Sequence, residues 1–231
     1  MRIVLAQSEA LMRTLGIILL TIVVLIGGAV AWWKINYPTY VYRYRMTVEV
    51  EVNGKVHSGS SVIEVSISNQ PQFGSAPPYV PHVRGEAIFV DLGEGRNVIA
   101  LLAAGRVAAN VNYPDQIVPA LFDVPFENWA TLGGMRGTKE MPISKLPTFV
   151  TFANLNDLKT VRFVNLGEFQ QIFGSAAHVP RVWIEMTDEP VTRGIQQKLP
   201  WLPHPRYLSG NFACAPSEPH CLHGGHFSRD Y

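Results

Sequence analysis

The pattern of hydrophobic and polar positions begins with one long apolar segment. Residues Leu15 to Trp33 run for nineteen residues without a charged side chain. A helix of that length spans about 28 Å, which matches the hydrocarbon core of a bilayer. The segment also lacks the polar face that a helix of a soluble protein turns to water. We therefore predict a transmembrane helix over residues 15–33, preceded by a short cytoplasmic amino terminus (1–14), with the lipid bilayer as a partner.

Aromatic and basic residues gather where this helix would leave the bilayer. Such residues are typical of the headgroup region, where their polar parts reach water. The predicted membrane-interface residues are Trp32, Trp33, Lys34, Tyr37 and Tyr40.

A cleaved signal peptide is an alternative for the same segment. The apolar run from Leu15 to Ile26 has the length of a signal-peptide core, and Ala29-Val30-Ala31 offers a cleavage site after Ala31. Translation from Met12 instead of Met1 would leave a short basic segment in front of it. Both interpretations export the rest of the chain.

The orientation follows from competing signals. Arg2 and Arg13 precede the segment, whereas Lys34, Arg43 and Arg45 follow it, so the positive-inside count alone favours a cytoplasmic domain. The signal-like anatomy and the charge-poor, strand-rich domain favour translocation. We expect a single-pass protein of the bacterial inner membrane with its carboxy-terminal domain in the periplasm.

After the apolar segment the hydrophobic period changes to two. From Tyr40 to Val52 apolar side chains alternate with Arg, Thr and Glu, as in a half-buried strand. Asn53-Gly54 follows, and this dipeptide is typical of a type I′ hairpin turn. The pattern predicts a hairpin whose return strand covers residues 55–68.

Further short elements follow from turn residues and apolar runs. The segment 69–83 reads as a proline-bearing loop, and 112–143 as irregular with one short helix near 115–122. Two more hairpins are predicted, with turns at 93–96 and 154–157, followed by a short helix at 167–173 and a strand at 179–187. Asp188 and Pro190 predict the start of a capped helix that Pro200 ends.

The predicted fold class is α+β, mostly antiparallel β hairpins with a few short helices, preceded by one amino-terminal transmembrane helix. A β-rich periplasmic domain covers residues 37–205, and 206–231 form a flexible tail. Hydrophobic residues make up 47% and charged residues 16% of the chain, with a net charge of +1. No basic stripe is visible, so we predict no nucleic-acid partner.

The chain shows no motif that indicates catalysis. His57 and Ser58 are neighbours in a predicted strand, so their side chains point to opposite faces and do not form a catalytic pair. Gly93-x-Gly95 lacks the third glycine of a dinucleotide-binding loop. The carboxylates of the first hairpin face arginines and lysine across the strands. We therefore predict no catalytic residue and no cofactor, although the residues do not decide whether the protein is an enzyme.

The tail carries both cysteines. In an oxidising compartment Cys214 and Cys221 are expected to form a disulfide that clips the tail locally. His220, His223 and His226 surround the second cysteine and are the candidate metal ligands, but Gly224-Gly225 disfavours a preformed site.

The stretches "YRMTVEVEVNGK", "GSSVIEV" and "MTDEPVTRGIQQKLPWL" resemble segments of uncharacterised single-pass envelope proteins of proteobacteria, over residues 37–205. The resemblance implies a bacterial inner-membrane setting. That group has no assigned activity, so the resemblance gives no catalytic residue. Our functional hypothesis is a non-enzymatic, membrane-anchored periplasmic protein that binds or supports a protein partner as an accessory subunit. The alternative is a metal-binding protein or metal-dependent enzyme that uses the tail histidines together with a residue such as His204.

Overall fold

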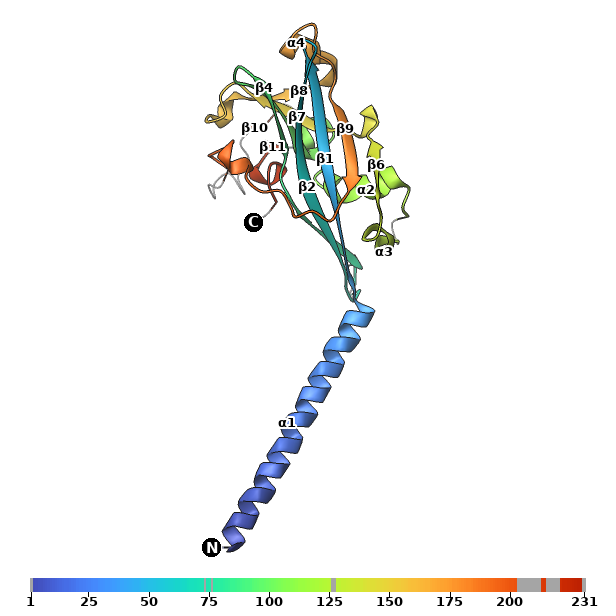
Figure 1. Cartoon of the computed structure of the whole chain (residues 1–231), viewed down its shortest axis with the longest axis vertical. Helices are drawn as coiled ribbons and strands as arrows, with labels where there is room; N and C mark the ends of the chain where they lie inside the picture. The colour runs from blue at the N-terminus through green and yellow to red at the C-terminus, as the bar shows by residue number, and fades with distance from the viewer. Residues whose placement is uncertain are drawn as a thin grey trace. The chain divides into compact units, whose positions relative to one another are not determined.

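The computed structural model describes residues 2–72, 74–75, 77–125, 128–202, 213–214 and 221–229, of which 2–11, 107, 213 and 214 are described by their backbone alone. The helices are α1 (Arg2–Asn36), α2 (Tyr113–Phe122), α3 (Trp129–Leu132) and α4 (Phe169–Phe173). The strands are β1 (Thr39–Val52), β2 (Lys55–Asn69), β3 (Tyr79–Arg84), β4 (Ile88–Gly93), β5 (Arg96–Ala104), β6 (Gly137–Glu140), β7 (Pro147–Phe152), β8 (Val161–Val164), β9 (Arg181–Met186), β10 (Ala213–Cys214) and β11 (Cys221–Leu222). Short 3-10 turns join several of them (Figure 1).

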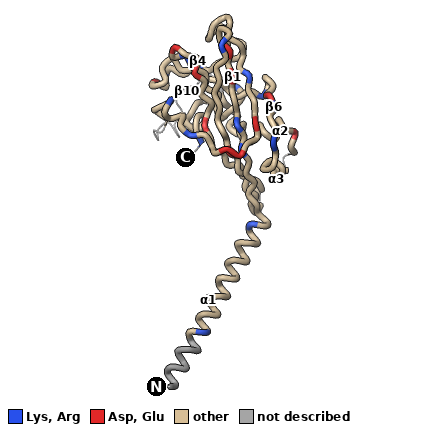
Figure 2. The backbone as a smooth tube through the Cα atoms, viewed as in Figure 1, with Lys and Arg blue, Asp and Glu red and all other residues tan. Residues whose placement is uncertain are grey.

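The chain divides into two compact units. One holds residues 1–39 and 68–80, and the other holds residues 40–67 and 81–231. The first unit is dominated by α1, whose stretch from Met12 to Asn36 has a mean hydropathy of 2.6 and is long and apolar enough to cross a membrane. The charged residues of this stretch are Arg13 and Lys34, and Figure 2 shows no charged residue on the helix between them. The predicted segment 15–33 lies within this longer helix.

The second unit begins with the predicted hairpin. Asn53 and Gly54 have φ angles of 53° and 75°, as both central residues of a type I′ turn require. Along β1 the side chains from Tyr42 to Val52 are buried at every second position. The alternation predicted for this strand is therefore confirmed: one face of β1 is buried and the other faces outward.

Within the described residues, five strands form one antiparallel sheet in the order β3-β2-β1-β9-β6, four form a second in the order β4-β5-β7-β8, and β10 pairs with β11. Strand β9 inserts beside β1 with Tyr44 opposite Met186 and Glu49 opposite Arg181. The α+β fold class with antiparallel hairpins is thus confirmed, including the hairpins at 93–96 and 154–157.

Each face of the four-stranded sheet is covered. The side chains on both faces of β5 are buried, from Asn97 to Ala104. On one face Ile99, Leu101 and Ala103 pack in a cluster with residues of the carboxy-terminal region, namely Ile195, Leu199, Trp201, Leu202, Leu222 and Phe227. The buried face of the five-stranded sheet contacts α2, because the hydroxyls of Tyr42 and Tyr44 donate to the carbonyls of Asp115 and Pro114.

The predicted helix from Asp188 to Leu199 is wrong. Residues 187–194 are not helical, and only a 3-10 turn, Ile195–Gln197, forms. The backbone N–H of Thr192 donates to the carbonyl of Val62 instead, and its hydroxyl accepts from the Val62 amide. The segment is therefore joined to β2 at Thr192, and in Figure 1 it crosses β1 and β2.

Two predicted loops contain additional structure. Tyr79–Arg84 forms β3 at the edge of the five-stranded sheet, where Pro81 is tolerated because an edge strand has one unpaired side. The region called irregular holds α3 and the second edge strand, β6. Both strands are short, and β6 pairs with β9 more than forty residues further along the chain, which leaves little local signal.

The end of the chain differs from the flexible tail that its composition predicts. Leu222 and Phe227 are fully buried, and His226 and Ser228 are nearly so. The Ala87 amide donates to the carbonyl of Phe227, and Arg229 N–H donates to that of Gly85. Residues 221–229 therefore belong to the core, although polar and glycine residues dominate this stretch.

Candidate functional site

The tail histidines have structural roles in the turn Gly224–His226. The Nδ1 atom of His223 accepts from the Gly225 amide at 3.1 Å, and the Nδ1 atom of His226 accepts from the His223 amide at 3.0 Å. The two rings lie 3.9 Å apart between centroids. Each Nδ1 lone pair is thus already engaged by an amide hydrogen.

Among the residues that the structure describes, no three His, Cys, Asp or Glu side chains gather as a metal site requires. His220 and His204 lie outside the described residues. The structure therefore brings together two of the three predicted ligands, in a pairing that stabilises a turn.

Arg229 ties this turn to the rest of the domain. Its Nε donates to the carbonyl of Gly225 at 3.1 Å. Its Nη2 donates to the carbonyls of Leu102, at 3.0 Å, and Val111. One guanidinium therefore satisfies acceptors from the tail, from β5 and from the turn before α2.

A pocket of about 570 Å³ opens beside Arg229. It is lined by β3, by the start of α2 and by the tail. The lining residues are Pro81, His82, Val83, Val111, Asn112, Asp115, His223, Gly225, Ser228 and Arg229. The pocket thus combines an apolar rim with an acidic and a basic side chain.

The charges of this pocket are largely removed from water. Burial raises the pKa of Asp115 above its usual value, and the nearby Arg229 partly opposes this effect. Burial also lowers the pKa of Arg229, yet a guanidinium stays protonated in proteins. Burial lowers the pKa of His223 and, more strongly, that of His226, to about 3, so both imidazoles are neutral at pH 7. The pocket therefore presents one fixed cation and a carboxyl group with a raised affinity for a proton.

The sequence did not single out Asp115 or Arg229. They lie more than one hundred positions apart, and only the packing of the tail against β5 and α2 brings them to one pocket. A basic residue in a glycine-rich end gives no signal of burial.

The predicted membrane-interface residues occupy the end of α1 and the chain that follows. Trp32, Trp33 and Lys34 lie in the last turns of the helix. The ring of Tyr37 contacts both indoles, at centroid distances of 6.1 Å and 4.7 Å. Tyr40 lies in β1. Trp32, Trp33 and Tyr37 thus form one aromatic cluster.

The two cysteines are opposite each other in the short β10–β11 pair, where Cys214 is the register partner of Cys221. Directly opposed residues in antiparallel strands have Cα atoms about 4.5–5.5 Å apart, within the range for a disulfide. The side chain of Cys214 lies outside the described part of the chain. The disulfide therefore stays a prediction, although the backbone geometry is compatible with it.

His57, the other histidine considered for chemistry, contacts the backbone. Its Nδ1 lies 2.8 Å from the carbonyl of Asp91. This contact ties the first hairpin to β4 and favours a structural role for the ring.

No family model matches the chain, and neither a curated protein nor a solved structure is similar to it. The chain is therefore classified by its fold alone. It has a two-sheet α+β unit and one long apolar helix.

Proposed function

We propose that the chain is a non-enzymatic protein anchored in a bacterial inner membrane by α1, with its β-rich unit in the periplasm. There it binds a protein partner as an accessory subunit of a membrane complex. The observation that carries the anchor is the stretch Met12–Asn36, of which no part is buried within the structure.

The exposed surface of α1 needs an apolar environment. Ile17, Leu19 and Leu25 are each about two-thirds exposed, at 66%, 65% and 67%. Soluble monomers rarely expose contiguous apolar patches larger than a few hundred Å². A bilayer would cover all sides of this helix at once, and the cluster of Trp32, Trp33 and Tyr37 at its end suits the headgroup region.

The cysteine register is compatible with the proposed periplasmic orientation. Opposed cysteines with a compatible backbone form disulfides in oxidising compartments and stay reduced in the cytosol. A bond between Cys214 and Cys221 would therefore fit an exported domain.

The pocket beside Arg229 supports a binding role. A carboxylate of a partner, on a side chain or at a chain end, would complement the guanidinium, while the exposed apolar side chains of Pro81 and Val111 would pack against its neighbours. The ring nitrogens of His57, His223 and His226 that contact backbone groups favour structure over catalysis. No observation in the described residues favours the alternative of metal binding through the tail.

Two experiments test this proposal with the full chain in a bacterial host. The anchored protein should stay in the membrane pellet after alkaline carbonate extraction, and protease added to intact spheroplasts should degrade its domain. Release by carbonate would contradict the anchor. Protection from protease in spheroplasts would contradict the orientation.

The partner is tested by pull-down in mild detergent with two matched variants. Val111 is 40% exposed and lines the pocket, whereas Val56 is 56% exposed on β2 outside it. A partner recovered with wild type and with Val56→Asp, but lost with Val111→Asp, is the expected result. A partner that both variants retain would show that the pocket is not its binding site.

A further inference from the structure

The pocket beside Arg229 holds an acidic and a basic side chain that do not satisfy each other. The charge of Arg229 partly opposes the raised pKa of Asp115, but no ion pair or hydrogen bond joins the two side chains within the described residues. Asp115 is 8% exposed, and among the described residues its carboxyl group accepts only from its own backbone amide. Buried carboxyl oxygens need hydrogen-bond donors. The carboxyl group of Asp115 is therefore open to a donor from a bound molecule.

Arg229 also keeps hydrogen-bonding capacity for a bound molecule. Its Nε and Nη2 donate to the carbonyls of Gly225, Leu102 and Val111. In the described part of the chain its Nη1 makes no hydrogen bond, although it carries two hydrogens. The backbone contacts hold the guanidinium in place, so an anion that binds to Nη1 restricts little further motion. The pocket can thus hold one carboxylate at a defined position.

Two further donors line the same pocket. Ser228 is 3% exposed, and its hydroxyl oxygen has no partner among the described residues. The ring of His223 is neutral at pH 7, and its Nδ1 accepts from the Gly225 amide. The hydrogen of this imidazole is therefore on Nε2, which is a donor. The pocket thus offers several donors to an anionic oxygen and, in Asp115, one acceptor beside them.

A side-chain carboxylate of a partner would satisfy only part of this arrangement. It would accept from Arg229, but the methylene groups next to it donate no hydrogen bond, so Asp115 would stay unpaired and would repel it. The carboxy-terminal residue of a polypeptide carries a carboxylate and, one carbon away, a backbone N–H. It therefore brings the acceptor and the donor together in one residue.

We propose that this pocket binds the carboxy-terminal residue of a polypeptide partner, with its carboxylate on Arg229 and Ser228 and its N–H on the carboxyl group of Asp115. The inference rests on the partner-binding function proposed above and names the part of the partner that is recognised. Pro81 and Val111 are exposed and line the same pocket. A last residue with an apolar side chain therefore fits beside them.

The test uses the full chain in phosphatidylcholine nanodiscs and isothermal titration calorimetry. The probes are four acetylated tripeptides with a free carboxylate, acetyl-Ala-Ala-X, in which X is Ala, Val, Leu or Phe. At least one should bind, and an apolar X larger than Ala should bind more tightly. An amide in place of the terminal carboxylate should weaken the Kd of the best probe by about tenfold or more, because its charge-assisted hydrogen bonds are lost. N-methylation of the last residue should also weaken it, since the N–H is lost.

A double-mutant cycle isolates the contact with Asp115. Asp115→Ala removes the acceptor and should weaken the Kd of the best probe by about tenfold. N-methylation of the probe should then change the Kd by less than about twofold, because the two changes remove the same hydrogen bond. An N-methylation effect as large in Asp115→Ala as in wild type would overturn the proposed geometry.

Ser228→Ala and Ser61→Ala form a matched pair. Both serines are buried, at 3% and 2%, and both hydroxyls lack a partner within the described residues, but only Ser228 lines the pocket. Ser228→Ala should weaken the Kd by about threefold or more, whereas Ser61→Ala should leave it within about twofold of wild type. Equal effects of the two variants would count against the assigned hydroxyl and overturn its place in the site.

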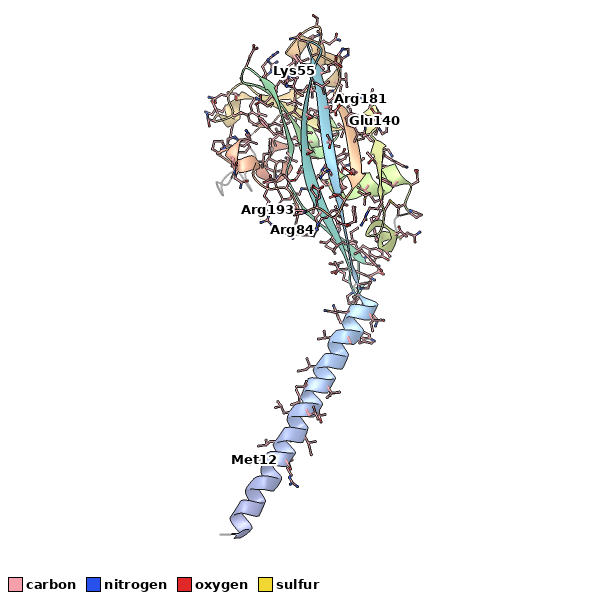
Figure 3. The ribbon with its side chains drawn as sticks, viewed as in Figure 1. Met12, Lys55, Arg84, Glu140, Arg181 and Arg193 are labelled. Carbon is pink, nitrogen blue, oxygen red and sulfur yellow. The ribbon has the colours of Figure 1, made fainter. Side chains whose placement is uncertain are left out.

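Arg181→Gln controls for general attraction between the protein and an anionic peptide. Arg181 is exposed and paired with Glu140, and Figure 3 shows it well away from Arg84, the last residue of the pocket-lining strand β3. Its loss should leave the Kd within about twofold of wild type, because surface charges beyond a Debye length are screened. Unchanged midpoints of thermal unfolding show that each variant keeps its fold.

The outcomes separate this inference from the proposed function. A free-end tripeptide that binds, and that loses affinity on amidation and on N-methylation, supports recognition of a chain end. Acetyl-Ala-Glu-Ala amide or free valine, if either binds as tightly as the best tripeptide, would overturn the inference in favour of a side-chain carboxylate or a small amphoteric ligand. Absence of binding by all four tripeptides would overturn it as well. A partner that the pull-down still loses with Val111→Asp would then leave the proposed function in place.

Discussion

Removal of the Glu86 side chain should loosen the carboxy-terminal part of the domain. Glu86 lies between β3 and β4 and is 4% exposed. Its Oε1 and Oε2 accept from the amides of Gly194 and Ile195, both at 2.9 Å. These amides open the turn that leads Leu199 and Leu202 into the core cluster. Glu86→Ala therefore takes both acceptors from the start of a buried segment.

The magnitude follows from the number of amides left without an acceptor. A buried donor that loses its partner costs about 1–3 kcal/mol, so the loss of both acceptors in Glu86→Ala should lower the free energy of unfolding by about 2–6 kcal/mol. Glu86→Gln keeps one acceptor oxygen and should cost roughly half as much. Glu51→Ala is the control, because Glu51 is exposed on the outer face of β1 and surface changes stay within about 0.5 kcal/mol.

The assay is urea unfolding of the full chain in detergent micelles, followed by tryptophan fluorescence. Trp201 lies between Phe152 and Phe227, at 5.9 Å and 5.3 Å, so its emission reports on this cluster. Hydrogen exchange at Leu199 and Leu202 should accelerate in Glu86→Ala. A midpoint equal to that of Glu51→Ala, with unchanged exchange, would refute the role assigned to the carboxylate.

Three further outcomes are expected. A Cβ on Gly59 would lie 2.2 Å from a backbone oxygen of β4, so Gly59→Ala should lower the free energy of unfolding by about 1–3 kcal/mol in the same titration. Gly167→Ala is the control, because the space around this glycine is open, and it should leave the free energy of unfolding unchanged. Equal unfolding midpoints for the two variants would contradict this. Burial lowers the pKa of His226 from 6.5 to about 3, so below pH 6.5 the unfolded chain binds a proton that the native chain does not. The unfolding free energy of wild type should therefore fall by about 2.5 kcal/mol more than that of His226→Gln between pH 7 and 4.5. Parallel pH profiles would exclude this linkage. In protein isolated from bacterial membranes, maleimide should label neither Cys214 nor Cys221 before reduction and both afterwards, as mass spectrometry would show. Labelling without reduction would contradict the disulfide.

The elements that the sequence predicted correctly are those whose signals are local. The alternation in β1 and the Asn53-Gly54 turn lie within a single hairpin, and no distant residue is needed to select that geometry. The turn of the second hairpin, Gly93 to Arg96, is defined in the same way. In both cases the turn residues and the hydrophobic period favour the same structure.

The failed helix shows how distant contacts override local signals. Asp188 and Pro190 are good residues for a helix start, but the carboxylate of Asp188 binds Arg136 instead of capping amides. Thr192 pairs with the backbone of β2, and the amides of Gly194 and Ile195 are taken by Glu86. Every partner in this list lies more than fifty residues away. A prediction made from the local sequence of this segment cannot include these contacts.

The candidate site was hidden for the same reason. The pocket needs Asp115 and Arg229, which come from α2 and from the end of the chain. Their residue types are ordinary on a protein surface.

The position of Leu222 changes the expected effect of a disulfide at the end of the chain. In a loose tail, a bond between Cys214 and Cys221 would restrict only a short loop, by about 2–3 kcal/mol in the chain-entropy model. Leu222 follows Cys221 directly and is fully buried in the cluster that contains Phe227 and Ile99. A bond at Cys221 would therefore restrain a residue of the core. Because Arg229 lies in the same segment, reduction should also loosen the wall of the pocket that it lines.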